Sequence, residues 1–348
     1  MYRKTLSLKD MRTIVSLLFG SLFQLGVCAQ TPDAKSLHEA AGNFMKQGDF
    51  NNAILVLNKA LDLEPNNLEL SKDLALAYFQ KNDLPKTQTV IKPLLERTDA
   101  DESVYQLAGM LYKATNDLKE CERIYKKGLK NFPASGPLYN DYGELLWGKD
   151  NYNAIKLWEK GIETDHNCSS NYYNASRYYY FTQDKVWNLI YGEIFVNMES
   201  YSRRTVEIKT LLLESYKKLF TESDMLKYQD TKNGFVVAFL NSMTRQSGVA
   251  SEGITPESLT MIRTRFILDW FEKESSKFPY RLFDYQRQLI KEGTFGAYNQ
   301  WLFGSIQNLD VFQTWTTTHT DEYNQFTNSQ KSRLFKTSSG QYYQTTSK

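Results

Sequence analysis

The stretches AGNF at 41–44, ALAY at 75–78, GMLY at 109–112 and GELL at 143–146 decide the fold, because they recur at intervals of 34 residues. Each stretch begins with a small residue and ends, three positions later, with a large apolar one. Residues three apart share one side of an α-helix, so the small residue lets a neighbouring helix approach closely while the large residue fills the adjoining space. A fixed period of this length predicts helical hairpins that stack on one another.

A second set of small and bulky residues follows the first within the period. It comprises Ala53, Leu57 and Ala60 before Pro65, and Cys121, Tyr125 and Gly128 before Pro133. A 34-residue unit with both sets resembles the tetratricopeptide repeat. The resemblance implies an all-α solenoid that binds other proteins, and only rarely a catalyst.

The period divides the chain into four clear repeats and a weaker fifth. They run from Ala34 to Asn67, Leu68 to Asp101, Glu102 to Ser135, Gly136 to about Cys168, and Tyr172 to about Met198. We therefore expect a solenoid over residues 30–200. Beyond it the period is lost although helical patterns continue, which predicts a helical C-terminal domain over residues 201–330. Residues 331–348 are rich in Ser, Thr, Gln and Tyr without periodicity, and we expect them to be a disordered tail.

The first 29 residues have the pattern of a cleaved secretory signal. Arg12 precedes an apolar run from Ile14 to Cys28, and Val27 and Ala29 provide the small residues that a cleavage site requires. We expect cleavage after Ala29, with translation starting at Met1 or Met11. The alternatives are lipidation of Cys28 and a membrane anchor, but the run is shorter than the roughly 20 residues that span a bilayer. The expected location is the periplasm of a Gram-negative type envelope, with no transmembrane segment after cleavage.

The charge of the mature chain argues against nucleic acid as a partner. Removal of residues 1–29 takes away four basic groups and one acidic group, so that 42 and 40 become 38 and 39. A nearly neutral chain without a basic stripe has no means of displacing counterions from a phosphate backbone. We therefore expect a protein or peptide partner of the envelope, through which the chain could also associate peripherally with a membrane.

The residues that carry chemistry are sparse. The three histidines, His38, His166 and His319, have no second ligand at metal-binding spacing, and no glycine-rich loop or nucleophile elbow is present. We expect no cofactor, no metal and no enzymatic activity. A carboxylate-based hydrolase stays open as an alternative, because the convergence of two carboxyl groups cannot be read from sequence.

The resemblance implies that the twelfth position of each first helix lines a concave groove. These positions are Met45, Phe79, Lys113, Trp147 and Tyr180, and Tyr173 and Arg177 lie beside them. Such a set offers aromatic area and one ammonium to an extended or helical peptide. We predict these seven residues as the partner-binding site. The open alternative is that the C-terminal helices fold back and fill the groove.

Tyrosines cluster at Tyr172, Tyr173 and 178–180. Either the rings are packed where the repeats meet another helical layer, or they stack on sugar rings. The sequence thus predicts a protein-binding scaffold of the cell envelope. Its alternative is a protein that binds or cleaves envelope glycan, with a site between the solenoid and the C-terminal domain.

Overall fold

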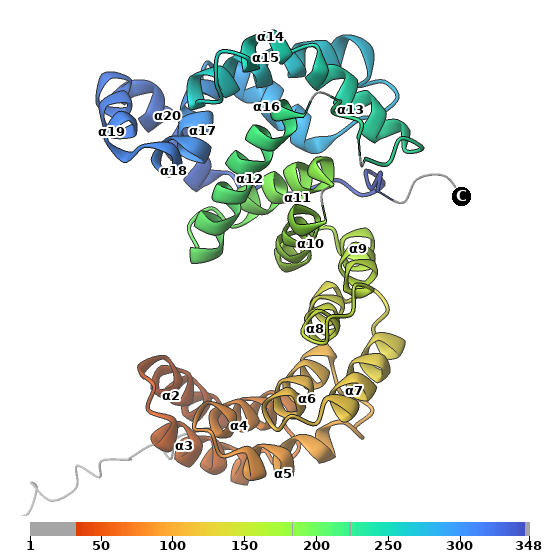
Figure 1. Ribbon diagram of the computed structural model, residues 1–348. Helices are drawn as coiled ribbons and strands as arrows, with labels where there is room; N and C mark the ends of the chain where they lie inside the picture. The colour runs from red at the N-terminus through yellow and green to blue at the C-terminus, as the bar shows by residue number, and fades with distance from the viewer. Residues whose placement is uncertain (1–32, 183, 223, 228, 345–348) are drawn as a thin grey trace, which may run out of the picture. The chain divides into compact units, whose positions relative to one another are not determined.

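The computed structural model describes residues 33–344 apart from 183, 223 and 228 (Figure 1). The predicted signal and its cleavage site lie outside the described residues. Every regular element in the described part of the chain is a helix, so the predicted all-α fold is confirmed. The chain divides after Val90 into two compact units.

The first unit contains the first predicted hairpin and most of the second. Its helices are α2 (Ala34–Gln47), α3 (Phe50–Leu63) and α4 (Leu68–Gln80), and α5 (Leu84–Leu94) begins in it. The side chains of Asp33, Asp49 and Asn67 accept hydrogen bonds from main-chain N–H groups three residues on, which caps the three helix starts. Ala53 and Leu57 are fully buried, as their places in the repeat predict.

A left-handed residue ends the first helix of each of four hairpins. Gly48, Asn82, Asn116 and Asp150 have φ between 54° and 76°, and they are spaced by the same 34 residues. Glycine, asparagine and aspartate are the residues that adopt this conformation most readily. The turn is therefore as periodic as the helix packing.

The second unit begins with three further hairpins. Their helices are α6 (Glu102–Ala114), α7 (Leu118–Asn131), α8 (Gly136–Trp147), α9 (Ala154–Thr164), α10 (Ser169–Phe181) and α11 (Lys185–Met198). The small residues have the predicted role. A Cβ on Gly109 would lie 2.3 Å from the Tyr125 ring, and one on Gly143 would lie 2.3 Å from the Trp158 indole nitrogen.

Helix α12 (Arg203–Thr221) continues the repeat beyond the expected boundary at residue 200. It packs against both α10 and α11. Ser170, Tyr173 and Tyr180 of α10 each bond a residue of α12 that lies 34 positions later. The 34-residue hydrophobic pattern does not reveal α12 as a sixth first helix, because α12 keeps the register through polar pairs and not through the small and aromatic residues that mark the others.

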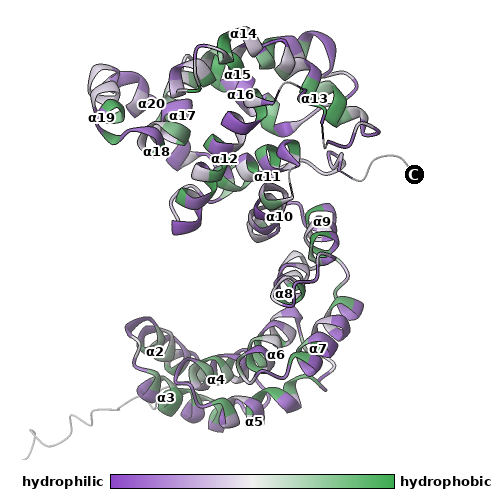
Figure 2. Ribbon diagram, in the orientation of Figure 1, coloured by the Kyte–Doolittle hydropathy of each residue, from purple (hydrophilic) through white to green (hydrophobic). Residues whose placement is uncertain are grey.

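The remaining helices form the C-terminal layer of the second unit, in which α13 contacts α11. They are α13 (Gly234–Thr244), α14 (Ser247–Ala250), α15 (Pro256–Lys273), α16 (Arg281–Lys291), α17 (Phe295–Asn299), the π-helical turn η1 (Gln300–Gly304), α18 (Ser305–Gln307), α19 (Leu309–Thr318) and α20 (Thr320–Ser332). Residues 185–197 of α11 are all buried. Helix α13, which contacts α11, is largely hydrophobic in Figure 2. A helix that is buried on every side becomes the centre of the core and not an edge of the solenoid.

A buried polar cluster joins α11 to this layer. The Arg263 guanidinium forms an ion pair with Glu193, and the Glu193 carboxylate also accepts hydrogen bonds from Gln286 and Tyr298. Arg263 and Glu193 are 1% and 4% exposed in their side chains. Because a buried charge is tolerated only when it is paired, this cluster fixes α11, α15 and α16 in one arrangement.

The structure differs from the expected disorder of the tail. Residues 333–344 run without helix across the second unit, where Phe335 is buried and the Tyr343 ring stacks on Phe235 at 5.0 Å. An extended segment held by two aromatic side chains has no helical period, which is why no sequence pattern indicated it. None of the described helices is both long enough and apolar enough to cross a bilayer.

Candidate partner-binding face

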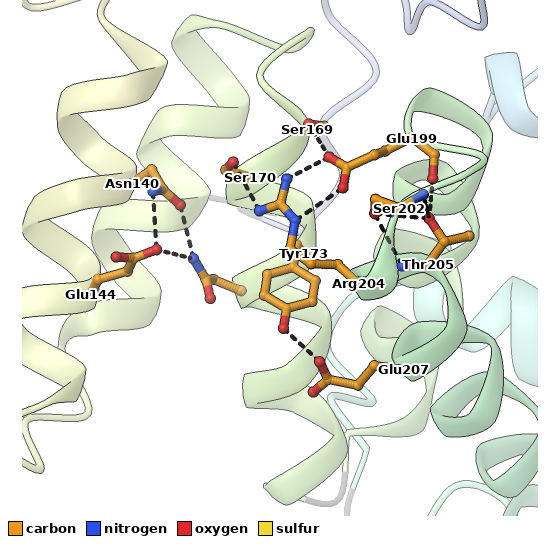
Figure 3. Close-up of polar contacts among 11 residues, drawn as sticks. Asn140, Glu144, Ser169, Ser170, Tyr173, Glu199, Ser202, Arg204, Thr205 and Glu207 are labelled. Atoms are coloured by element: carbon orange, nitrogen blue, oxygen red, sulfur yellow. Dashed lines mark hydrogen bonds and ion pairs between the residues drawn. The ribbon is translucent and has the colours of Figure 1, made fainter. Parts of the chain in front are cut away.

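Successive first helices of the second unit line up a row of mainly polar and aromatic side chains, which we call the first-helix face. Part of it is drawn in Figure 3. The face consists of Gln106, Lys113, Asn140, Asp141, Glu144, Trp147, Tyr173, Asn174, Arg177, Tyr180, Arg204, Glu207, Glu214 and Lys218.

Amide and carboxylate groups connect α6, α8 and α10 across the face. The Gln106 side-chain amide donates to Asp141 at 2.9 Å, and the Asn174 amide donates to the Asn140 side-chain oxygen at 2.8 Å. Asn140 in turn donates to Glu144 at 3.3 Å. Burial raises the pKa of Asp141, and the hydrogen bonds from Gln106 and Asn140 oppose that rise.

Tyr173 sits at the centre of the contacts between α10 and α12 (Figure 3). Its hydroxyl donates to Glu207 at 2.6 Å, and Arg177 forms an ion pair with the same carboxylate at 2.8 Å. The Arg204 guanidinium lies 4.9 Å from the centre of the Tyr173 ring. Burial, followed by the bond to Glu207, raises the pKa of Tyr173 to about 12, so its hydroxyl stays protonated and donates.

Arg204 is itself held by the turn that precedes α12. Its guanidinium forms two hydrogen bonds with Glu199 and one, at 3.2 Å, with Ser170 (Figure 3). Burial alone would raise the pKa of Glu199, but the hydrogen bonds from Arg204 hold it below its usual range. Ser202 and Thr205 cap the start of α12 reciprocally. The arginine is therefore oriented before any partner arrives.

Tyr180 borders a hollow at the C-terminal ends of α10 and α12. Its hydroxyl donates to Glu214 and accepts from the Lys218 ammonium at 3.1 Å, and that ammonium lies 4.1 Å from the ring centre. The hollow has a volume of about 340 Å³ and is also lined by Lys185 and Glu222.

Trp147 and Lys113 lie nearer the other end of the face. Trp147 is half-buried, with ring centres of Tyr152, Trp158 and Tyr178 within 6.0 Å of its own. Lys113 is exposed and pairs with Glu144 at 3.6 Å. Trp147 is thus partly accessible, while its contacts with these three rings contribute to packing.

The two remaining predicted residues belong to the first unit. Met45 and Phe79 are both half-buried, and Met45 packs against the core of that unit. His38 and Asp73, on neighbouring first helices of the same unit, are joined at 2.6 Å.

The structure brings Tyr173, Arg177 and Tyr180 together, but it also gives them partners that the sequence analysis did not foresee. These partners, Glu207, Glu214 and Lys218, all lie on α12. The signal that would have found them is the spacing of 34 from Tyr173 to Glu207 and from Tyr180 to Glu214. Among the described residues, no group of three or more His, Cys, Asp or Glu side chains is arranged to hold a metal ion.

Comparison with known proteins agrees with this architecture. Two models of the tetratricopeptide repeat match the chain, one at residues 44–111 and the other at residues 102–135. The chain therefore contains tetratricopeptide repeats, as the spacing predicts.

Two curated relatives are similar over a limited stretch. Human aspartyl/asparaginyl beta-hydroxylase is 26% identical over 125 residues, which is 35% of this chain and 16% of that protein. The bovine BBSome complex member BBS4 is 28% identical over 111 residues, which is 32% of this chain and 21% of that protein. The matches thus span about a fifth or less of the length of these relatives.

Two solved structures show a partial likeness to the chain. A tetratricopeptide repeat protein of Thermus thermophilus has a TM-score of 0.44 at 13% identity, over 52% of this chain and 99% of that one. One from Parabacteroides merdae has a TM-score of 0.40 at 15% identity, over 72% of this chain and 96% of that one.

Proposed function

We propose that this protein is a scaffold that binds a protein or peptide partner through its first-helix face. The observation that carries the proposal is the row of oriented amide, charged and aromatic groups that four consecutive first helices supply within residues 102–218. Tetratricopeptide repeats are typically used for protein interaction, and the row is of the kind that recognises peptides.

The chemistry of the face favours a peptide over a flat apolar partner. Gln106 is half-buried and offers an amide group that can bond a main chain, while the buried Asn140 and Asn174 hold Glu144 in place beside it. Trp147 and Tyr180 offer half-buried rings, and tryptophan and tyrosine are the residues most enriched at binding hot spots. Lys113 supplies an exposed ammonium for a carboxylate of the partner.

We place this binding in a bacterial cell envelope. The support is the apolar run from Ile14 to Cys28 with small residues at Val27 and Ala29, which is typical of an export signal. The partner would then be an envelope protein, and any association with a membrane would pass through that partner.

The test is capture of the partner from its native envelope. Tagged wild type, Lys113→Glu and Trp147→Ala proteins are cross-linked in cells, recovered, and analysed by mass spectrometry. Leu268→Ala is the matched control, because Leu268 is 59% exposed on α15 and lies outside the face. We expect wild type and the control to recover one protein that both face variants lose while keeping their helical circular dichroism. Equal recovery by all four proteins would refute the first-helix face as the site.

N-terminal sequencing of the mature protein tests the location separately. Cleavage after Ala29 in a fractionated envelope supports export, and an uncleaved chain in the cytosol refutes it.

A further inference from the structure

A second groove lies on a different side of α10 from the first-helix face, and residues 335–344 occupy it. We call it the outer groove and these residues the resident segment. The groove is lined by side chains of α9, α10, α11 and the start of α16, chief among them Ile162, Tyr172, Trp187, Tyr191 and Tyr280. All five of these lining side chains are buried.

Two aromatic side chains anchor the resident segment at its ends. The Phe335 ring is 6% exposed and lies 5.4 Å from the Tyr285 ring, with the Arg281 guanidinium 5.5 Å from its centre. Eight residues later the Tyr343 ring stacks on Phe235. Aromatic anchors in preformed pockets are what gives most peptide complexes their affinity.

Hydrogen bonds between the anchors fix the register of the segment. The Thr337 hydroxyl donates to the main-chain oxygen of His166, and the Gln341 side-chain oxygen accepts from the main-chain N–H of Arg281 at 2.7 Å. The Gln344 amide donates to the Tyr179 hydroxyl at 2.9 Å.

Tyr343 is held by three groups beside the outer groove, two at the start of α13 and one in the segment before α16. Its ring stacks on Phe235, its hydroxyl donates to the main-chain oxygen of Pro279 at 2.8 Å, and its own main-chain oxygen accepts from the Asn233 amide at 2.8 Å. The groove therefore reads both the side chain and the main chain at this position.

The way the segment is bound permits exchange. Within residues 334–344, every hydrogen bond that the structure gives to the groove involves at least one side chain, and no ladder of main-chain bonds forms. Lys336, Ser339 and Gly340 are exposed, and Gly340 turns the chain with a φ of 75°. A cavity of about 30 Å³ remains beneath the segment. The resident segment thus contacts the groove mainly through its side chains, as a bound peptide ligand does.

We propose that the outer groove is a peptide-recognition site that the resident segment keeps occupied, and that it accepts in trans an extended peptide with two aromatic residues spaced as Phe335 and Tyr343 are. The proposal is independent of the first-helix face, since the two surfaces use different side chains. A tethered segment acts at an effective concentration on the order of millimolar, so a partner peptide must compete with it.

The experiment measures binding of a fluorescein-labelled peptide of residues 333–344 to the full mature chain by fluorescence anisotropy. The proteins compared are wild type and the double variant Phe335→Ala, Tyr343→Ala, in which the resident segment is weakened but the groove is unchanged. A second double variant, Thr337→Val with Gln341→Leu, removes two hydrogen bonds that hold the resident segment but keeps its aromatic rings. A peptide of the same composition in scrambled order is the control.

We expect saturable binding of one peptide per chain, tighter by at least about tenfold in the weakened variants than in wild type, because the tethered competitor is lost. The scrambled peptide should not bind. Equal affinity for wild type and weakened variants, or no saturable binding to any variant that keeps its helical circular dichroism, overturns the proposal. If the first-helix face turned out not to bind a partner, these binding results would not change. The two proposals can therefore be refuted independently of each other.

Discussion

Replacing Glu159 by glutamine should change how the stability of this protein depends on pH. Glu159 lies on α9, is 7% exposed, and accepts a hydrogen bond from the Tyr179 hydroxyl while Tyr342 of the resident segment also faces it. Among the described residues, no lysine or arginine forms an ion pair with this carboxylate. Burial raises the pKa of Glu159 from its usual 4.5 to about 8.

The sign of the effect follows from proton uptake. Between pH 4.5 and about 8 the folded chain holds a proton on Glu159 that the unfolded chain has released, so the free energy of unfolding falls as the pH rises. A full proton difference changes that free energy by ~1.4 kcal/mol per pH unit. From pH 5 to pH 7.5 the wild type should therefore lose about 3 kcal/mol that Glu159→Gln retains, because glutamine keeps the acceptor oxygen without a charge.

Urea unfolding at pH 5 and pH 7.5 measures the difference. We expect the two proteins to be similar at pH 5, and the variant to be the more stable by about 3 kcal/mol at pH 7.5. Glu163→Gln is the matched control, since Glu163 is exposed one turn further along α9 and pairs with Lys160. Parallel pH profiles of wild type and Glu159→Gln would refute the reasoning.

Other groups around Glu159 leave this comparison intact. Burial raises the pKa of Asp184 to about 6, which gives a slope of the same sign between pH 3.8 and 6; it is the same in both proteins, because Glu159, with its pKa of about 8, is uncharged in the folded chain over that range. The pKa values of Tyr179, Tyr191 and Tyr342 are all raised by burial, so these hydroxyls stay neutral throughout.

Three further predictions concern packing and buried charge. Arg263→Met leaves Glu193 buried without its cation and should lower the free energy of unfolding by about 3–5 kcal/mol. The double variant Arg263→Met, Glu193→Gln should recover part of that loss, because no charge is then left buried. An equal loss of unfolding free energy in the single and the double variant would contradict a charge effect. Burial lowers the pKa of Lys209 from 10.5 to about 7, so the folded chain has lost a proton above pH 7 that the unfolded chain still holds. Between pH 7 and pH 8.5 the free energy of unfolding of wild type should therefore rise by about 2 kcal/mol relative to that of Lys209→Met. A difference between the two proteins that does not change with pH would argue against a buried amine. Gly143→Ala should lower the free energy of unfolding by about 1–3 kcal/mol, because the new Cβ meets the Trp158 ring. Gly42→Ala should be neutral or stabilising, because its Cβ would have nothing within 4 Å. Thermal melts in which Gly42→Ala is the less stable of the two would contradict this packing.

The sequence predicted the structure well wherever each repeat requires the same kind of residue at the same position. Gly109 and Gly143 could be assigned to close helix contacts because only a small residue fits against Tyr125 or Trp158. The same reasoning failed at α12. There the contact with α10 is made by hydrogen bonds from Tyr173 to Glu207 and from Tyr180 to Glu214. A hydrophobic pattern does not indicate polar pairs of this kind.

The outer groove was beyond sequence reasoning for a different reason. Its hydrogen bonds to the resident segment join residues far apart in sequence, from 60 positions between Arg281 and Gln341 to 171 between His166 and Thr337. No local period reports such a pairing. The tail composition, taken alone, predicted disorder because it lacks the apolar content of a helix, while two aromatic anchors and hydrogen bonds of side chains hold the chain in extended form.

The tyrosine cluster of α10 shows how one helix serves both surfaces. Tyr172 lines the outer groove and the Tyr179 hydroxyl bonds Glu159 and Gln344, whereas Tyr173 and Tyr180 bond residues of α12. A partner on the first-helix face must therefore compete with α12 for Tyr173 and Tyr180. Because such part-exposed polar contacts are worth about 0–1 kcal/mol each, exchange there requires little free energy. The described ring contacts of Trp147 are with Tyr152, Trp158 and Tyr178, so a partner that binds there, as proposed, would displace no polar neighbour of that ring.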